Sequence, residues 1–137
     1  MRARECTVED VALLAQMNKY SLEDDDPEAN LSLPHLENRM RDYINSGYKA
    51  FLFLIDEKVI GYALSNGAKP PIYLRQFFIV RDERRKGYGK QAFHLLLDLL
   101  GIQESDIDVY TWNDSTVRFW RTLGVDTRRN NKIVYTS

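Results

Sequence analysis

A basic, glycine-containing turn is the part of this sequence with the clearest potential for chemistry. Where such a turn opens a helix, unpaired backbone N–H groups and the positive end of the helix dipole favour an anion, and glycines let a phosphate come close. The residues therefore predict a site for a polyanionic ligand, made from Arg84, Arg85, Lys86, Gly87, Tyr88, Gly89 and Lys90. A solvent-exposed connection has the same composition, and the turn by itself does not separate the two interpretations.

The segments on either side of the turn indicate what positions it. Residues 72–80 form an apolar, aromatic and β-branched run that is typical of a buried strand. After the turn, apolar residues recur with the i, i+3, i+4, i+7 spacing of an amphipathic helix, at Phe93, Leu96, Leu97 and Leu100. The turn lacks the third glycine of a dinucleotide fingerprint and the Gly-Lys-Ser/Thr ending of a P-loop, so neither of these nucleotide loops is predicted.

Residues 84–89 resemble the Arg/Gln-x-x-Gly-x-Gly/Ala signature of the GNAT superfamily, the acyl-CoA-dependent N-acetyltransferases. The resemblance implies acetyl-CoA as co-substrate, no metal, and backbone amides of the signature that hold the CoA pyrophosphate. It also places Phe78, Ile79 and Val80 at the cofactor, with the main chain of Ile79 and Val80 pairing with the pantetheine arm.

A second pattern near the end of the chain supports the resemblance. Asn113 follows an expected fifth strand, and Trp120 stands four residues before Gly124. This is similar to the closing pattern of the GNAT family, and the resemblance implies that Asn113 and Trp120 contribute to the cofactor site.

The rest of the chain predicts an α/β fold with the element order β-α-α-β-β-β-α-β-α-β. Strands are expected near 2–6, 50–55, 59–64, 72–80, 106–111 and 133–135, and helices near 8–20, 32–47, 88–100 and 114–123. This order is similar to the GNAT fold from end to end. We therefore expect a single N-acetyltransferase domain over residues 1–137, with a mixed six- to seven-stranded sheet flanked by about four helices.

Length and composition exclude several classes of protein. The 137 residues carry 19 Lys+Arg and 20 Asp+Glu, a formal net charge of -1, which is not the charge of a nucleic-acid-binding domain. No apolar run approaches the roughly 18 residues that span a bilayer, and the charged start is not a signal peptide. The only cysteine, Cys6, excludes an internal disulfide and is expected to be packed. A cytoplasmic protein without nucleic-acid or membrane partners is expected.

The usual acid and base of the family do not carry over to this sequence. Residues 72–80 contain no carboxylate where many relatives place a general base, and Trp120 stands where a tyrosine often serves as acid. Positioning of the reactants can still lower the barrier by several kcal/mol. Tyr110 and Tyr73 are the candidates for relaying a proton, and packed strand tyrosines with a hydrated hydroxyl are the alternative. Glu83, His35 and His94 are expected at the surface.

Two features give opposite indications about the amine that would accept the acetyl group. An acidic run at 23–28, expected in a loop, would attract a cationic amine, or it is simply solvated. Arg75, if it points into the acceptor pocket, would favour an acceptor with a carboxylate, such as an amino acid or peptide end.

The sequence therefore leaves two main functions open. The first is an N-acetyltransferase that moves an acetyl group from acetyl-CoA to a small-molecule or peptide amine by direct attack in a ternary complex. The alternative is a non-catalytic acyl-CoA-binding or sensor domain, which the missing carboxylate and Trp120 favour. A homodimer is common in the family, but the sequence marks no interface.

Overall fold

A computed structural model describes the chain except for residues 27, 29, 68, 112–113, 126 and 130–137. The elements follow the predicted order and are β1 Arg2–Glu5, α1 Val11–Asp25, α2 Leu33–Asn45, β2 Lys49–Ile55, β3 Lys58–Ser65, β4 Ile72–Ile79, α3 Tyr88–Leu100, β5 Ile107–Thr111, α4 Asp114–Thr122 and β6 Thr127–Arg129. Short 3-10 turns precede α1, α3 and β5. The α/β class is confirmed.

The described strands form one six-stranded sheet in the sequential order β1-β2-β3-β4-β5-β6. β1 to β4 pair antiparallel. Short connections join β2 to β3 and β3 to β4, whereas α1 and α2 lie between β1 and β2. β5 and β6 are added in parallel, and α3 and α4 provide the crossovers that parallel pairing requires. β4 is therefore the strand at which the sheet changes from antiparallel to parallel.

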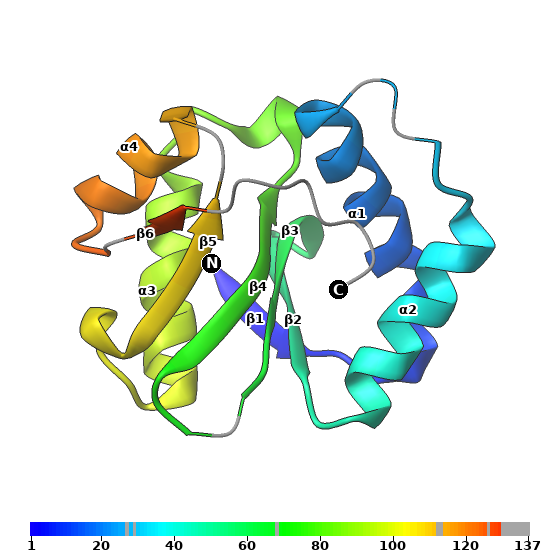
Figure 1. Ribbon diagram of the computed structural model, residues 1–137, viewed down its shortest axis with the longest axis horizontal. Helices are drawn as coiled ribbons and strands as arrows, with labels where there is room; N and C mark the ends of the chain where they lie inside the picture. Colours follow the sequence, from blue (N-terminus) through cyan, green and yellow to red (C-terminus); the bar gives the residue numbers. More distant parts are fainter. Residues whose placement is uncertain (27, 29, 68, 112–113, 126, 130–137) are drawn as a thin grey trace.

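Helices cover both faces of the sheet. α1 and α2 lie on one side and α3 and α4 on the other (Figure 1). On the α3 side, the stripe predicted from the helical spacing is buried: Phe93, Leu96 and Leu97 pack against sheet residues such as Leu74. On the α1 side, Leu14 and Met40 are fully buried or nearly so. Alternation along the strands supplies side chains to both layers.

Two sequence predictions differ from the structure near the chain's acidic run and its end. α1 continues to Asp25, so Glu23 and Asp24 belong to a helix and not to a loop. A short strand, β6, forms at Thr127–Arg129, which the sequence did not indicate because the segment has no apolar alternation. The strand predicted at 133–135 lies outside the described residues.

Three further findings concern other predicted properties. Cys6 is packed as expected, and burial raises the pKa of its thiol to about 12, so it stays protonated near neutral pH. No helix in the described part of the chain is long and apolar enough to cross a membrane. Among the same residues, His, Cys, Asp and Glu side chains form no cluster of three that could hold a metal ion.

Candidate active site

The central feature of the site is the divergence of β4 from β5. The two strands pair only at Ile72↔Ile107 and Tyr73↔Asp108 among the described residues, and β6 pairs with the opposite edge of β5. Figure 1 shows the two strands separating toward their carboxyl ends. The edge of β4 that follows Tyr73 is thus left without a strand on the β5 side, and an extended ligand could pair with it.

A β-bulge in β4 lies where this divergence begins. Leu64 of β3 is opposite Gln76, but the next residue, Ser65, is opposite Leu74, so Arg75 is the extra residue. A bulge bends a strand and increases its twist. The bulge therefore contributes to turning the second half of β4 away from β5.

At the end of β4, alternate residues direct their backbone N–H and carbonyl groups to opposite edges of the strand. The N–H of Val80 donates to the Ile60 carbonyl at 2.8 Å, and the Val80 carbonyl accepts from the N–H of Glu83 at 3.0 Å. Because antiparallel pairing alternates, Phe78 also directs its backbone toward β3, opposite Tyr62. Both backbone groups of Val80 thus have partners within the protein, and the expected pairing of its main chain with a pantetheine arm stays a prediction.

By the same alternation, the N–H of Ile79 points to the open edge. Its carbonyl accepts a 2.8 Å hydrogen bond from Nε of Arg84. The side chain of Phe78 is 6% exposed and lies under the Arg84 guanidinium, whose carbon is 5.2 Å from the ring centroid. Ile79 is thus the predicted strand residue that keeps a backbone donor on the open side, whereas Phe78 is a packing residue.

The turn after β4 has the geometry of an anion site. Arg85 and Gly87 both adopt left-handed backbone conformations, with φ of 65° and 79°. Gly87 is the N-cap of α3 and makes no side-chain cap. The hydrogen bond that opens the helix runs from the N–H of Gln91 to the Gly87 carbonyl, at 3.2 Å. The N–H groups of Tyr88, Gly89 and Lys90 precede this bond, so they have no acceptor within the helix. They lie at the positive end of the helix dipole.

The basic residues of the turn divide into two groups. Arg84 is held by Ile79 and by Asp24, and Lys86 is paired with Glu83 at 3.1 Å. Arg85 and Lys90 are exposed and form no ion pair with another described residue. Their charges are therefore the ones available to a polyanion.

Glu83, expected at the surface, is instead buried at 8% exposure. Its carboxylate accepts from Lys58 at 2.6 Å and from Lys86 at 3.1 Å. The hydrogen bond from Lys58, followed by that from Lys86, lowers the pKa of Glu83, so it stays ionised. It anchors the turn to β3, and its proton is not available for catalysis near neutral pH.

The two glycines of the turn differ in their surroundings. A Cβ at this position would lie 3.1 Å from the ring of Phe119, so the missing side chain lets α3 approach α4. A Cβ at Gly87 would meet nothing within 4 Å, which leaves that glycine open to a ligand. Gly87 is therefore the glycine of the turn whose surroundings fit the approach of a phosphate.

Trp120 lies in the core. It is 5% exposed, and its ring packs edge-on against Phe77 and Phe93, with centroids 5.3 and 5.4 Å away. Tyr88, at the start of α3, is partly buried against the same cluster. Asn113, the other residue of the closing pattern, lies outside the described residues.

The two candidate tyrosines are brought together. Tyr73 and Tyr110 are in T-shaped contact, with ring centroids 5.3 Å apart, at the point where β4 and β5 separate. Burial, the largest influence, raises the pKa of Tyr73, and Tyr110 is 46% exposed. Tyr73 therefore stays protonated at neutral pH, and the pair places one half-buried and one exposed tyrosine at the start of the gap.

The sequence missed a polar cluster on the α2 side of β4. The guanidinium of Arg75 lies over the rings of Tyr43, Tyr48 and Tyr73. Nearby, the hydroxyl of fully buried Tyr62 donates to Gln76 Oε1 at 2.7 Å. The tyrosines come from one helix, one loop and two strands, so no local spacing in the sequence could have indicated the cluster.

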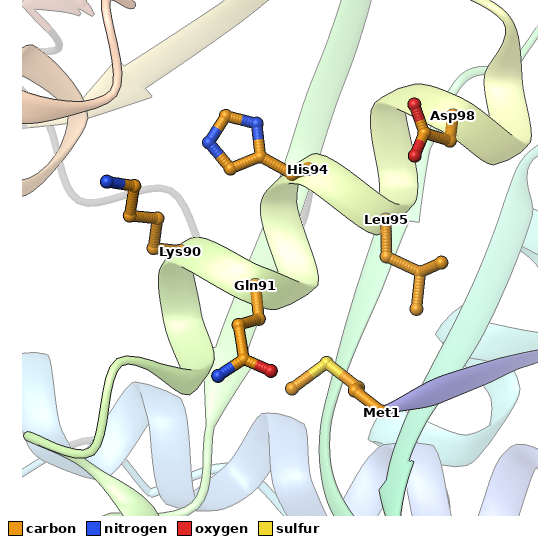
Figure 2. Close-up of a pocket in the computed structure, with 6 residues that line it drawn as sticks. All are labelled: Met1, Lys90, Gln91, His94, Leu95 and Asp98. Atoms are coloured by element: carbon orange, nitrogen blue, oxygen red, sulfur yellow. The ribbon is translucent and has the colours of Figure 1, made fainter.

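The outer side of α3 carries a separate surface cavity of about 400 Å³. It is lined by Met1, Lys90, Gln91, His94, Leu95 and Asp98 (Figure 2). None of these residues belongs to β4 or β5. The exposed position of His94 agrees with the sequence prediction, and Lys90 lies at the end of the cavity nearest the turn (Figure 2).

Comparison with known proteins identifies the class. The acetyltransferase (GNAT) family matches residues 14–125, which contain both sequence patterns and most of the sheet. The chain belongs to this family. No curated protein matches the sequence.

Solved structures share the fold over almost the whole chain. A possible acetyltransferase from Clostridium difficile 630 has a TM-score of 0.71 at 16% identity, covering 99% of this chain and 97% of its own. A predicted acetyltransferase from Clostridium acetobutylicum, solved with acetyl-CoA, has a TM-score of 0.70 at 15% identity, covering 99% and 95%. An aminoglycoside acetyltransferase from an uncultured soil metagenomic sample, in complex with sisomicin, has a TM-score of 0.66 at 17% identity, again covering 99% and 95%. At these identities the likeness concerns the fold.

Proposed function

We propose that this protein is an N-acetyltransferase that moves an acetyl group from acetyl-CoA to a primary amine by direct attack in a ternary complex. The observation that carries the proposal is the open edge of β4, which leads from the divergence at Tyr73 to the uncapped first turn of α3. An extended thioester ligand with a pyrophosphate at one end matches this arrangement. Membership of the acetyltransferase family and the acetyl-CoA bound to a structural neighbour support it.

The proposed cofactor contacts follow from the backbone. The N–H groups of Tyr88, Gly89 and Lys90 bind the pyrophosphate, with Arg85 and Lys90 adding charge. The N–H of Ile79 pairs with the pantetheine arm, which runs along the open edge of β4 toward the thioester. Arg84 acts indirectly, because its side chain holds the Ile79 carbonyl and so orients the end of the strand.

The chemistry requires one new bond and one broken bond. The neutral amine attacks the thioester carbonyl, the carbon–nitrogen bond forms, the carbon–sulfur bond breaks, and the thiolate takes up a proton. Tyr73 and Tyr110 lie at the beginning of the gap, and burial keeps Tyr73 protonated at neutral pH, so these two side chains are the proposed proton donors. Without a carboxylate on β4, the amine proton passes to water, and positioning of the two substrates supplies much of the rate.

A second function is favoured by a specific observation. This function is that of a non-catalytic acyl-CoA-binding domain. Trp120 is buried at the position of the family's usual acid, and β4 carries no carboxylate that could act as a base. A domain that only binds acyl-CoA needs neither group. The two functions differ in turnover. Binding of acetyl-CoA with release of free CoA on adding an amine indicates the enzyme, whereas binding without release on any amine indicates the binding domain.

The test combines isothermal titration of acetyl-CoA with a thiol-release assay over a panel of amines, including an aminoglycoside, a polyamine, amino acids and a peptide. Arg85→Glu is expected to weaken acetyl-CoA binding at least tenfold, because Arg85 lies in the turn and has no other described ion pair. Arg41→Glu, on the exposed surface of α2, changes the net charge equally and is expected to bind normally. Equal affinity in wild type and Arg85→Glu would contradict the placement of the cofactor.

A further inference from the structure

Arg75 is held in a fixed position beside the gap between β4 and β5. Its guanidinium carbon lies 4.8, 5.2 and 5.5 Å from the ring centroids of Tyr73, Tyr43 and Tyr48. Its Nε also donates to the hydroxyl of Tyr48 at 3.2 Å. Aromatic faces attract a cation and restrict where it can lie. The positive charge of the bulged residue is thus directed to the α2 side of the gap.

A second guanidinium lies at the hydroxyl end of the same Tyr43. Nη2 of Arg39 is 3.5 Å from this hydroxyl, whereas Nε and Nη1 are buried without a hydrogen-bond partner. In the described part of the chain, no carboxylate forms an ion pair with Arg39. Burying a guanidinium without an anion is unfavourable. Tyr43 therefore lies between two cations, and one of them, Arg39, has buried nitrogen atoms without a hydrogen-bond partner.

The carboxylates that might have favoured a cationic acceptor are partly engaged elsewhere. Asp24, in the acidic run of α1, accepts hydrogen bonds from Arg81 and Arg84 at the end of β4. Its charge is thus used within the protein. Of the two opposite indications in the sequence, the negative charge of Asp24 is thus offset by two arginines, whereas the positive charge of Arg75 lies near the point where β4 and β5 separate.

We propose that the acceptor amine also carries an anionic group, a carboxylate or a phosphate, which binds the cluster of side chains formed by Arg39, Tyr43, Tyr48, Tyr73 and Arg75. This inference rests on the proposed acetyltransferase function and names the class of its acceptor. The anion pairs with Arg39 and Arg75, tyrosine hydroxyls add hydrogen bonds, and the amine of the same molecule points along the gap toward the thioester. Polycationic amines, including aminoglycosides, are disfavoured by charge.

The test compares amines that differ mainly in the group at the far end. Thiol release is measured for propylamine, 3-aminopropanoate, 2-aminoethyl phosphate and 1,3-diaminopropane. We expect kcat/KM to be at least tenfold higher for one or both anionic amines than for propylamine, and lowest for the diamine. The better of the two anionic amines identifies the anion. Equal or higher kcat/KM for propylamine or the diamine would overturn the inference.

Variants locate the anion. Arg39→Gln and, as a second variant, Arg75→Gln are expected to remove the preference, so that kcat/KM for each anionic amine falls to about the value for propylamine measured with the same variant. Arg41→Gln, two residues from Arg39 on the exposed surface of α2, is the matched control and is expected to keep the preference. A preference that survives in both Arg39→Gln and Arg75→Gln would overturn the inference, because the anion would then bind elsewhere.

A binding measurement separates failure of this inference from failure of the proposed function. If no amine is acetylated, the proposed function fails. Titration calorimetry with 3-aminopropanoate and 2-aminoethyl phosphate then still tests whether an anionic amine binds the cluster around Arg39 and Arg75. An affinity for these ligands that is at least tenfold weaker in Arg39→Gln than in Arg41→Gln supports binding of the anion at this cluster. No binding to wild type, or equal binding to the two variants, overturns it.

Discussion

The carboxylate of Asp24, near the end of α1, accepts a 2.8 Å hydrogen bond from Nη2 of Arg84, sixty residues further along the chain. A second arginine, Arg81, contacts the other carboxylate oxygen. Arg84 in turn donates to the Ile79 carbonyl at 2.8 Å. The end of α1 is thus connected to the end of β4, where the turn that precedes α3 begins. The two arginines also offset an acidic residue at a helix C-terminus, which the helix dipole would disfavour.

Asp24→Asn tests this connection through pH dependence. Partial burial opposes ionisation of Asp24, but hydrogen bonds from Arg84 and Arg81 outweigh it and lower its pKa. A lowered folded-state pKa gives stability that is present above the unfolded pKa of about 3.9 and is lost as pH falls through the folded pKa. We expect a loss of about 0.5–1 kcal/mol at pH 7 in low salt, discounted for solvent screening.

Urea unfolding of wild type and Asp24→Asn at pH 7 and near pH 2 measures this effect. The difference between the two proteins should shrink at the lower pH and at high salt. Asp42→Asn, on the exposed surface of α2, is the control and should behave like wild type. A difference that persists unchanged near pH 2 would show that the carboxylate charge is not responsible.

The two glycines that flank α3 form a matched pair for testing the anion site. Gly87 and Gly101 have φ of 79° and 68°, and a Cβ at either would meet nothing within 4 Å. Alanine at each should therefore cost a similar amount, about 1 kcal/mol, because both require the left-handed conformation. Only Gly87→Ala should weaken acetyl-CoA binding, by tenfold or more, because its methyl group projects where the phosphate approaches.

Urea unfolding and titration calorimetry on both alanine variants provide the comparison. Gly101→Ala controls for strain at the end of α3, since it lies at the far end of the helix. If the two variants lose affinity equally, the effect comes from the helix as a whole, and the first turn is not the phosphate site.

Trp120 is expected to matter for stability more than for proton transfer. Its ring is 5% exposed among Phe77, Phe93 and Phe119. Trp120→Ala should cost about 3–5 kcal/mol of unfolding free energy, as large aromatic truncations in a core do. Trp120→Tyr, which restores the family's usual acid by residue type, should not raise kcat, because the new hydroxyl would be buried in an apolar cluster. A several-fold rise in kcat would show instead that the hydroxyl reaches the reacting sulfur.

The parts of the structure that follow from local spacing could be predicted from the sequence. The strand at 72–80, the glycine turn and the helix with Phe93 and Leu96 agree with the structure, because period and turn chemistry are local properties. The end of α1 could not be predicted, since Asp24 is paired with arginines that are distant in the sequence. The orientation of the Val80 backbone could not be predicted either, because it depends on the register between β3 and β4.

The candidate site divides in the same way. The residues proposed to bind the pyrophosphate through backbone groups lie at the start of α3, a position that the glycine turn and the helical spacing predict. The arginine and tyrosine side chains around Arg75 come from α2, β4 and the segment before β2, and only the packed fold brings them together. Arg39, with buried nitrogens that lack a partner, has no signature in the sequence.

Tyr73 is the residue that we expect to protonate the departing thiolate. It is half-buried beside Tyr110, and burial raises its pKa above the ordinary value of about 10, so it remains a donor throughout the neutral range. Tyr73→Phe should lower kcat by about a hundredfold with little change in the KM for acetyl-CoA, because general acid catalysis contributes on this scale. Tyr110→Phe should have a smaller effect, since water can replace an exposed hydroxyl.

The pH profile distinguishes a proton donor from a packing residue. In wild type, kcat should fall only above pH 10, where the raised pKa of Tyr73 is finally reached, and this alkaline limb should be absent in Tyr73→Phe. Tyr20→Phe, 52% exposed on α1, controls for loss of a surface hydroxyl and should match wild type. An unchanged kcat in Tyr73→Phe, or an alkaline limb that persists in it, would show that water supplies the proton. Tyr73 would then act only as a packing residue that positions Arg75.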